Sequence, residues 1–364
     1  MPFSDFHGNA DVVRRLREIL ARDRFPHAVI LAGGEGAGKY TLALMLTRAM
    51  NCLQPLETDG LPDYCGTCGN CRRIADAEDL DARFAEAVEA REGLRETDKR
   101  ETRIFVQTHP DVLIIPPDPP QMLIKVDQVR HVINTIHFLP ADGRRRVYIF
   151  TDSSFIKEAA NALLKILEEP PEYATIFLAA RNPADLLPTI RSRCSIFRLS
   201  ALSVSEIERD LAAQRPQWSP RQRELVARLS GGAVGMARSL NLEEYLESRK
   251  HALLLLGSAA QSADHSPLFR ATDEYRAGAE GKDKTDQLLS AVYVLLHDIM
   301  ALNSGASELV RNVDIAAELK SLAQVIDFRR IVQAAQQVGQ VQSGMRRNVL
   351  RSLSLDAFAL SLER

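Results

Sequence analysis

The sequence predicts an α/β domain that is built on a parallel sheet and carries a phosphate-binding loop, followed by segments that are helical only. A short apolar run at 27–32, a glycine-rich loop and a helical segment at 41–50 follow one another in the order that such a loop requires. Strand-like and helical segments then alternate up to residue 180, which is typical of a parallel sheet covered on both faces. From residue 242 onward the pattern is helical.

Length and composition suit a soluble protein of two or three domains. The chain has 364 residues, of which 45% are hydrophobic and 26% charged, and its net charge is −2. This charge gives no general attraction for nucleic acid, so contact with DNA requires a local cluster of Lys and Arg or a partner subunit. No signal segment begins the chain and no apolar stretch suits a membrane span, so we predict a cytoplasmic protein without a membrane partner.

Residues 33–41 have the pattern of a phosphate-binding loop but lack the hydroxyl that normally follows the lysine. In such loops backbone amides hold phosphate, the lysine reaches the terminal phosphates, and a Ser or Thr ligates Mg²⁺. Tyr40 occupies that last position, and the side chain of Thr41 is turned by about 100° along the helix. The loop is therefore a candidate site for ATP or ADP in which Mg²⁺ is not expected. Its predicted nucleotide-binding residues are Gly33, Gly36, Gly38, Lys39 and Thr41.

Four of the five cysteines lie close together in the sequence, at Cys52, Cys65, Cys68 and Cys71. In a chain without a signal segment this crowding indicates reduced thiols gathered on a metal rather than disulfides. Four thiolates fill a tetrahedral zinc shell and leave no position for a reacting water, so the predicted Zn²⁺ is structural. Cys194 stands alone and is expected to be a small core residue.

Hydrophobic patterns predict the remaining elements. Residues 76–101 are highly charged, with a weak apolar edge at Leu80, Phe84 and Val88, and are expected to form a solvated helical insertion. A capping box at 203–206 begins a helix. Strands are expected at 109–117, 144–150 and 174–180, helices at 127–138 and 158–169, and a long loop at 278–286.

Several motifs occur in a fixed order along the chain. After the Lys39 loop and the cysteines come a strand that runs into Asp152, the helical sequence EAANALLKILEEPP from residue 158, and the sequence IRSRC from residue 190. Together these residues strongly resemble the clamp-loader subunits of bacterial DNA polymerase III, which belong to the AAA+ family. The resemblance covers residues 1 to about 240 well and the rest in outline, where Asn348 and Val349 resemble part of the family's last helices.

The resemblance implies three domains. The first, at 1–199, is a P-loop AAA+ domain with a zinc module at about 51–72 and a charged insertion at about 76–105. A small helical lid at 200–242 and a helical collar for oligomerisation at 243–364 follow.

Two kinds of subunit in this family have this layout. The gamma/tau subunit hydrolyses ATP, whereas the delta-prime subunit mostly lacks hydrolysis. Hydrolytic members carry an Asp-Glu pair where this chain has Phe150 and Thr151, with Asp152 one or two positions late. They also carry an arginine where this chain has Gly235. With Tyr40, these departures remove charges or ligands on which phosphoryl transfer depends, and they favour the delta-prime type.

Arg193 matches the family's arginine that reaches the ATP site of a neighbouring subunit. A guanidinium supplied in this way stabilises the charge on the transferring phosphoryl group. The resemblance therefore implies a subunit that donates Arg193 to a neighbour while a sliding clamp is loaded onto primed DNA. Its implied partners are the gamma/tau and delta subunits and, through the complex, the clamp and the DNA.

Two alternatives stay open. An active gamma/tau-like ATPase would need the Asp152 carboxylate to reach the magnesium shell. A zinc-bearing DNA-binding adaptor without ATP chemistry would show a steep, salt-dependent affinity for DNA, against which the near-neutral charge argues. The three arginines at 144–146 are a weaker candidate for contact with phosphate.

Overall fold

The computed structural model describes residues 2–261 and 278–345. The chain divides into two compact units: Met1–Ser203 with Ala233–Met236, and Val204–Gly232 with Ala237–Arg364. The first unit contains a mixed, mostly parallel sheet with helices, and the described part of the second is helical. The predicted fold class is therefore confirmed, while the division into three domains stays a prediction.

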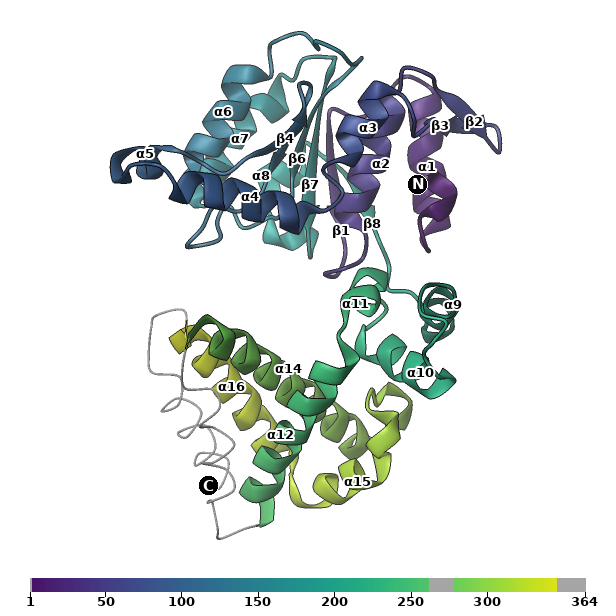
Figure 1. The fold of residues 1–364 in the computed structure, drawn as a ribbon, viewed down its shortest axis with the longest axis vertical. Coiled ribbons are helices and arrows are strands. Elements are labelled where there is room, and N and C mark those ends of the chain that lie inside the picture. The colour runs from purple at the N-terminus through teal and green to yellow at the C-terminus, as the bar shows by residue number, and fades with distance from the viewer. Residues whose placement is uncertain (1, 262–277, 346–364) are drawn as a thin grey trace. The chain divides into compact units, whose positions relative to one another are not determined.

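Six strands form the sheet of the first unit in the order β4-β5-β6-β7-β1-β8 (Figure 1). Neighbouring strands are parallel, except that β4 is antiparallel to β5. In register, the last residue of β1 lies beside the last residue of β7, so their carboxyl ends meet at one edge of the sheet together with that of β6. The strands are β1 (Ala28–Ala32), β4 (Val106–His109), β5 (Val112–Ile115), β6 (Arg146–Phe150), β7 (Ala174–Ala180) and β8 (Ser195–Arg198).

The sheet separates two apolar cores. Successive residues of a strand point to opposite faces, so Val29 and Leu31 of β1 enter one core and Ala28 and Ile30 enter the other. Helices α1, α2 and α3 cover the first face and α6, α7 and α8 the second, as Figure 1 shows. Their bounds are Ala10–Ala21, Lys39–Asn51, Gly69–Ala75, Val126–Thr135, Lys157–Glu168 and Pro188–Arg191.

A small hairpin and two charged helices are inserted between α2 and β4. The hairpin consists of β2 (Leu56–Thr58) and β3 (Leu61–Asp63), which are antiparallel. Its turn residues Asp59 and Gly60 have φ of 55° and 70°, the left-handed conformation of a tight two-residue turn. The insertion forms α4 (Leu80–Glu92) and α5 (Glu96–Glu101), in which Leu80, Phe84 and Val88 are half-buried, as the weak apolar edge predicted.

One predicted strand begins later than expected, and one predicted loop is wrong. Within residues 109–117 the buried strand is β5 (Val112–Ile115), because the chain turns at Pro110 and Asp111 and His109 belongs to β4, which is antiparallel to β5. Residues 278–286 are not a loop, because α14 (Gly278–Asn303) begins there. Later turns of α14 bury Leu288, Val292 and Leu295, and such tertiary packing outweighs the weak helix propensity of glycine.

Four helices of the second unit, all after residue 241, share an apolar core. Leu255 of α12, Leu295 of α14, Leu319 of α15 and Val338 of α16 are among the buried residues of this core. The helices of the unit are α9 (Val204–Gln214), α10 (Pro220–Leu229), α11 (Val234–Ser239, partly in the first unit), α12 (Leu242–Gln261), α14, α15 (Ala316–Val325) and α16 (Phe328–Met345). Helix α9 begins where the capping box predicted.

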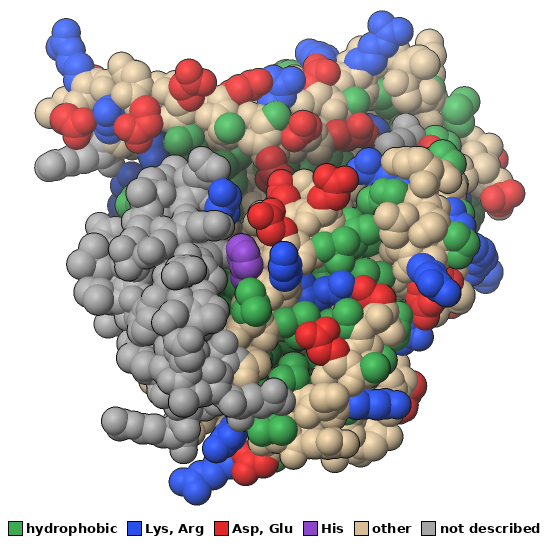
Figure 2. All heavy atoms as spheres, turned by 60° about the horizontal axis from the view of Figure 1, so that its bottom comes forward, with side chains coloured by type: hydrophobic (Ala, Val, Ile, Leu, Met, Phe, Trp, Pro, Cys, Tyr) green, Lys and Arg blue, Asp and Glu red, His purple; other side chains and the backbone are tan. Residues whose placement is uncertain are grey.

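The surface of the second unit is mixed in character. Figure 2 shows apolar side chains lying among charged ones on this face. The large apolar side chains exposed on the unit include Tyr293 of α14 and Phe328 of α16. Among the described helices, none combines the length and apolar character that crossing a bilayer requires. The resemblance noted at Asn348 and Val349 lies outside the described residues.

Candidate nucleotide and metal sites

The glycine-rich loop connects the carboxyl end of β1 to the first turn of α2. Gly36 and Gly38 have φ of 70° and 86°, which side-chain-bearing residues rarely adopt. A Cβ at Gly33 would lie 2.8 Å from the carbonyl oxygen of Leu199. The loop borders a cavity of about 350 Å³ at the carboxyl edge of the sheet. A loop whose glycines leave the backbone exposed beside a cavity fits phosphate groups held by amides.

Lys39 lies within this loop. Its Nζ donates hydrogen bonds to the carbonyl oxygens of Gly33 at 2.7 Å and Gly34 at 2.6 Å. Burial, followed by the nearby guanidinium of Arg181, lowers the pKa of Lys39, while the carboxylates of Glu35 and Asp152 act in the opposite direction. The structure thus brings the predicted lysine to the cavity that the loop glycines border.

Tyr40 does not offer a magnesium ligand in this arrangement. Its hydroxyl donates to the carbonyl oxygen of Ala77 at 2.6 Å, and its ring packs against the core formed with α1, α2 and α3. Burial raises the pKa of this phenol. Thr41 lines the cavity together with Tyr40, so the turn of the helix does not by itself take Thr41 away from the site.

The end of β6 supplies a single carboxylate. Phe150 is fully buried in the core, whereas Thr151 and Asp152 line the cavity. The Asp152 carboxylate accepts the backbone N–H of Ser154 at 2.7 Å. Of the two acidic positions expected in a hydrolytic subunit, one is therefore apolar and buried and the other is a threonine.

Gly235 lies directly against the phosphate-binding loop. Its backbone N–H donates to the carbonyl oxygen of Gly36 at 2.9 Å. A Cβ at Gly235 would meet that same oxygen at 2.8 Å, and a Cβ at Gly36 would meet the backbone nitrogen of Met236 at 2.6 Å. The contact therefore fits two glycines. Arg238, further along, forms two hydrogen bonds with the Asp210 carboxylate, at 2.9 and 2.5 Å.

Arg181 is a site residue that the sequence reasoning missed. It directly follows β7, lines the cavity, and forms an ion pair with Glu35 of the loop at 2.5 Å. A usable signal was present, because ligands of parallel α/β sheets bind at the carboxyl ends of strands and the strand 174–180 was predicted. Finding Arg181 also required knowing that β7 is the neighbour of β1, which only the sheet order gives.

The four predicted metal ligands come together. The sulfur atoms of Cys52, Cys65, Cys68 and Cys71 all lie within 4.8 Å of one another, and all four thiols are free. The Cys52 sulfur is 3.6 Å from that of Cys65 and 4.0 Å from that of Cys68. Zinc–sulfur bonds of about 2.3 Å in a tetrahedron place neighbouring sulfurs about 3.8 Å apart. The donor set therefore fits a closed zinc shell.

Backbone amides point at these sulfurs. The N–H of Cys65 donates to the Cys52 sulfur at 3.4 Å, and the N–H of Cys68 donates to the Cys65 sulfur at 3.3 Å. Burial acts to raise the pKa of Cys65, but hydrogen bonds from the amides of Cys68 and Thr67 outweigh it and lower the pKa to about 6. These amides thus favour the thiolate form of Cys65, whereas burial raises the pKa of Cys52 and Cys71.

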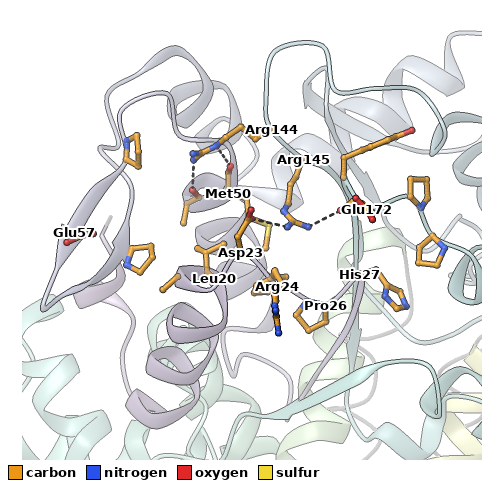
Figure 3. Close-up of a pocket in the computed structure, with 18 of the residues that line it drawn as sticks. Leu20, Asp23, Arg24, Pro26, His27, Met50, Glu57, Arg144, Arg145 and Glu172 are labelled. Carbon is orange, nitrogen blue, oxygen red and sulfur yellow. Dashed lines mark hydrogen bonds and ion pairs between the residues drawn. The ribbon is translucent and has the colours of Figure 1, made fainter.

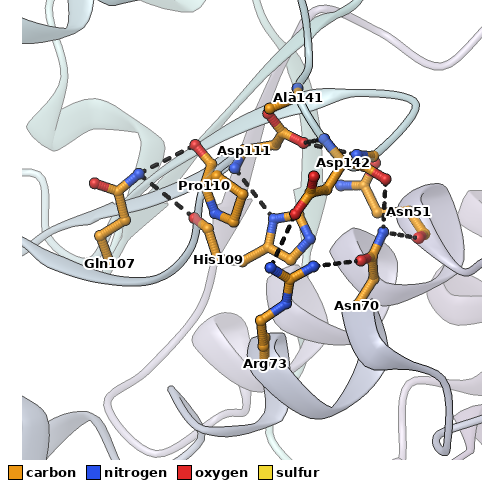
Figure 4. A network of polar contacts seen from close by, with 10 residues as sticks. Asn51, Asn70, Arg73, Gln107, His109, Pro110, Asp111, Ala141 and Asp142 are labelled. Carbon is orange, nitrogen blue, oxygen red and sulfur yellow. Dashed lines mark hydrogen bonds and ion pairs between the residues drawn. The ribbon is translucent and has the colours of Figure 1, made fainter.

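Polar contacts join this cysteine module to the sheet (Figure 4). Asn70 of α3 donates to the carbonyl oxygens of Asn51 and Asp142, each at 3.0 Å. Asp111, in the turn before β5, accepts three backbone N–H groups from residues 141–143. These amides outweigh the effect of burial and lower the pKa of Asp111. The module is therefore fixed to the loop that leads into β6.

The arginines at 144–146 are engaged within the protein, which argues against the phosphate contact considered for them. Arg144 donates to the carbonyl oxygens of Met50, Ala49 and Cys52 at the end of α2. A positive charge there also interacts favourably with the negative end of the helix dipole. Arg145 pairs with Asp23 at 3.5 Å and donates to the Glu172 carbonyl, as Figure 3 shows. Both line a cleft of about 1150 Å³ at the amino edge of the sheet.

Arg193 lies at the opposite edge of the sheet from the phosphate-binding loop. It precedes β8, whose first residue Ser195 pairs with Val29 near the start of β1. Its guanidinium donates to a Glu168 carboxylate oxygen at 2.7 Å and to the carbonyl oxygen of Thr189 at 3.0 Å. The side chain is 35% exposed.

Comparison with known proteins agrees with the motifs. The family model described as DNA polymerase III, delta subunit, matches residues 8–203, and the model for the C-terminal part of that subunit matches residues 276–363. The DNA polymerase III subunit delta' of Escherichia coli (strain K12) is 28% identical over 312 residues, which cover 84% of this chain and 78% of that protein. The delta' subunit of Bacillus subtilis (strain 168) is 24% identical over 313 residues, covering 86% and 83%.

Subunit tau of Escherichia coli (strain K12) is also similar, with 31% identity over 243 residues. These residues cover 65% of this chain but 32% of tau, so the chain spans about a third of the tau relatives that it matches. The delta-subunit match at 8–203 covers more than half of the chain. The resemblance seen between Lys39 and Cys194 is thus confirmed, and the chain belongs to the DNA polymerase III delta-subunit family.

Proposed function

We propose that this chain is a delta-prime-type subunit of a DNA polymerase III clamp loader and largely lacks ATP hydrolysis of its own. In this role it joins gamma/tau and delta subunits in the complex that loads a sliding clamp onto primed DNA. One observation supports this proposal above the others: residues at or beside the positions needed for hydrolysis make other contacts. The Tyr40 hydroxyl binds Ala77, the Asp152 carboxylate binds the Ser154 amide, and Gly235 contacts the loop through its backbone.

Phosphoryl transfer depends on charge stabilisation and on positioning of the attacking water. The loss of a single stabilising group typically costs about 10²- to 10³-fold in rate. Here a magnesium hydroxyl, an acidic pair and an arginine are replaced together. We therefore expect the loop, through Lys39 and the amides of Gly33–Gly38, to hold ATP or ADP as a structural ligand without turning it over.

The position of Arg193 supports action on a neighbouring subunit. Strand β8 is parallel to β1, and Gly33 lies four residues beyond Val29, the partner of Ser195. At about 3.3 Å per residue, this alone separates the level of Ser195 from the loop by about 13 Å, and Arg193 precedes Ser195 on the far side. This separation keeps the guanidinium away from its own loop and so supports a role at the site of a neighbour.

The Glu168 ion pair leaves Arg193 available. Its partners are 35% and 53% exposed, and an exposed pair of this kind contributes about 0–1 kcal/mol. A phosphoryl group on a neighbouring subunit offers the guanidinium a stronger, bidentate partner than one carboxylate oxygen.

The zinc module, in turn, serves the stability of the domain rather than its chemistry.

Two measurements test this function. The first is ATP turnover by the purified chain with Mg²⁺ beside Lys39→Ala, where we expect no difference. Turnover that depends on Lys39 would instead support the gamma/tau-like ATPase. The second is clamp- and DNA-stimulated ATP turnover of the reconstituted complex.

For the reconstituted complex, we expect Arg193→Ala to slow turnover by about 10³-fold or more. Arg198→Ala, at an exposed arginine on the adjacent β8, is the charge-matched control and should turn over at the wild-type rate. An unchanged rate for Arg193→Ala would overturn the role of Arg193.

A further inference from the structure

We propose that Arg181 binds the terminal phosphate of a nucleotide in this loop and replaces the positive charge of Mg²⁺, while Glu35 is the internal anion that Arg181 must leave. This inference rests on the proposed function in one respect, namely that the loop binds ATP or ADP. It adds the prediction that binding is independent of Mg²⁺ and is tuned by the Glu35–Arg181 pair.

The backbone places Arg181 beside the loop. The N–H of Gly33 donates to the carbonyl oxygen of Ala180 at 3.0 Å, so the residues that follow β1 and β7 leave the sheet together. The Arg181 guanidinium lies 2.5 Å from the Glu35 carboxylate, and both residues line the cavity with Lys39. The two cations are close enough that Arg181 contributes to the lowered pKa of Lys39.

The charges of the cavity cancel in the structure as it stands. Lys39 and Arg181 carry two positive charges, and Glu35 and Asp152 carry two negative ones. A bound triphosphate brings several negative charges that need compensation. The Tyr40 hydroxyl, at the position where a magnesium ligand is expected, donates to Ala77, and Asp152, the carboxylate that follows β6, accepts the Ser154 N–H. The guanidinium of Arg181 is thus the charge in this cavity best suited to the task.

Arg181 can exchange the Glu35 carboxylate for a phosphate group at little cost in free energy. The side chains of Arg181 and Glu35 are 72% and 68% exposed, so their ion pair is screened by water and weak. A guanidinium binds phosphate oxygens through two parallel N–H···O bonds, and such charge-assisted pairs are among the stronger hydrogen bonds. Glu35 therefore competes with the nucleotide for Arg181, and substitutions of the two residues should act in opposite directions.

The test measures binding of fluorescently labelled ADP and ATP to the full chain by fluorescence anisotropy, in Mg²⁺ and in EDTA. We expect the same Kd in both buffers. Arg181→Gln should weaken binding by about tenfold or more, and Glu35→Gln should strengthen it by about two- to fivefold. Arg181→Lys keeps the charge without the fork and should lie between wild type and Arg181→Gln.

Two controls separate this inference from the proposed function. Lys39→Ala should abolish binding, which locates the ligand in the loop. Arg24→Gln, at an exposed arginine on the amino edge of the sheet, should leave the Kd unchanged and so excludes a general charge effect.

Several results would overturn the inference. Wild-type affinity in Arg181→Gln, or loss of binding in EDTA, would contradict it while leaving nucleotide binding intact. A wild-type chain that binds neither nucleotide in either buffer would remove both this inference and the structural nucleotide, but not the role of Arg193. Circular dichroism of each variant establishes whether it folds. If Arg181→Gln does not fold, the expected gain in nucleotide affinity of Glu35→Gln still tests the inference.

Discussion

Gly235 and Gly36, 199 positions apart in the sequence, are joined by a backbone hydrogen bond of 2.9 Å between the Gly235 N–H and the Gly36 carbonyl. The Gly36 backbone occupies the space where a Gly235 side chain would lie, and Met236, the residue after Gly235, occupies that of a Gly36 side chain. The position at which hydrolytic relatives are expected to carry an arginine is therefore a backbone contact with the loop. Gly235 also lines the cavity beside the phosphate-binding loop.

We predict that Gly235→Ala destabilises the protein, because its Cβ would lie 2.8 Å from the Gly36 oxygen and 3.0 Å from the Gly36 Cα. Overpacking of this kind costs about 1–3 kcal/mol, measured as the change in free energy of unfolding in urea. Gly34→Ala is the matched control, since a Cβ there meets nothing within 4 Å. Equal stability of the two variants would show that the Gly36 backbone can move to admit the Cβ of residue 235 at little cost in free energy.

The cysteine cluster predicts one zinc ion per chain. Cys71→Ser should abolish stoichiometric zinc, measured by metal analysis of the purified chain, and should lower the midpoint of thermal unfolding. Cys194→Ala, at a cysteine outside the cluster, should retain the metal. A strong chelator added to the wild-type chain should reproduce the stability loss of Cys71→Ser, because a closed zinc shell contributes folding free energy. Retention of zinc by Cys71→Ser would contradict the four-thiolate site.

Glu168→Gln tests whether the carboxylate restrains Arg193. Because the pair is partly exposed, the variant should unfold within about 1 kcal/mol of the wild type. In the reconstituted complex we expect its stimulated ATP turnover to be at least as fast as that of the wild type, opposite in direction to Arg193→Ala. A slowdown as large as that of Arg193→Ala would mean that Glu168 must position the guanidinium.

His109 predicts a loss of stability in acid. It is 1% exposed, and its Nδ1 accepts the backbone N–H of Asp111 at 3.1 Å. Burial, followed by the charge of Arg73, lowers its pKa below the ordinary 6.5, while the carboxylates of Asp111 and Asp142 act weakly the other way. Below pH 6.5 His109 therefore binds a proton in the unfolded chain more readily than in the native protein, and the free energy of unfolding falls as pH falls.

His109→Asn measures this contribution, because its amide oxygen can still accept the Asp111 N–H but does not titrate. The free energy of unfolding, followed in urea between about pH 5 and pH 7.5, should fall less steeply for the variant than for the wild type. One proton contributes at most about 1.4 kcal/mol per pH unit. His131, whose pKa is also lowered by burial, is unchanged in the variant and cancels from the comparison. Equal slopes would contradict the prediction.

Local patterns predicted much of the fold because the relevant signals lie within a few residues. The strand, loop and helix around Lys39 follow from adjacent periodicities, and β7 has the predicted bounds. The cysteine cluster followed from spacing, since the reach of short loops brings its four thiols together. The edge strand β4 and the start of α14 were missed because a turn at Pro110 and glycines near residue 278 compete with packing that acts over long distances in the sequence.

The sequence by itself determined the family, the glycine-rich loop with its lysine, the four cysteines that could hold a metal and the lack of a Ser or Thr at position 40, because each depends on residue type and spacing along the chain. Tertiary structure alone decided that Arg181 pairs with Glu35, that Gly235 meets Gly36, and that Arg193 lies far from its own loop. These relationships depend on which strands are neighbours and on which edge of the sheet each segment leaves. Strand order results from packing of the whole domain, and no local pattern of side chains encodes it.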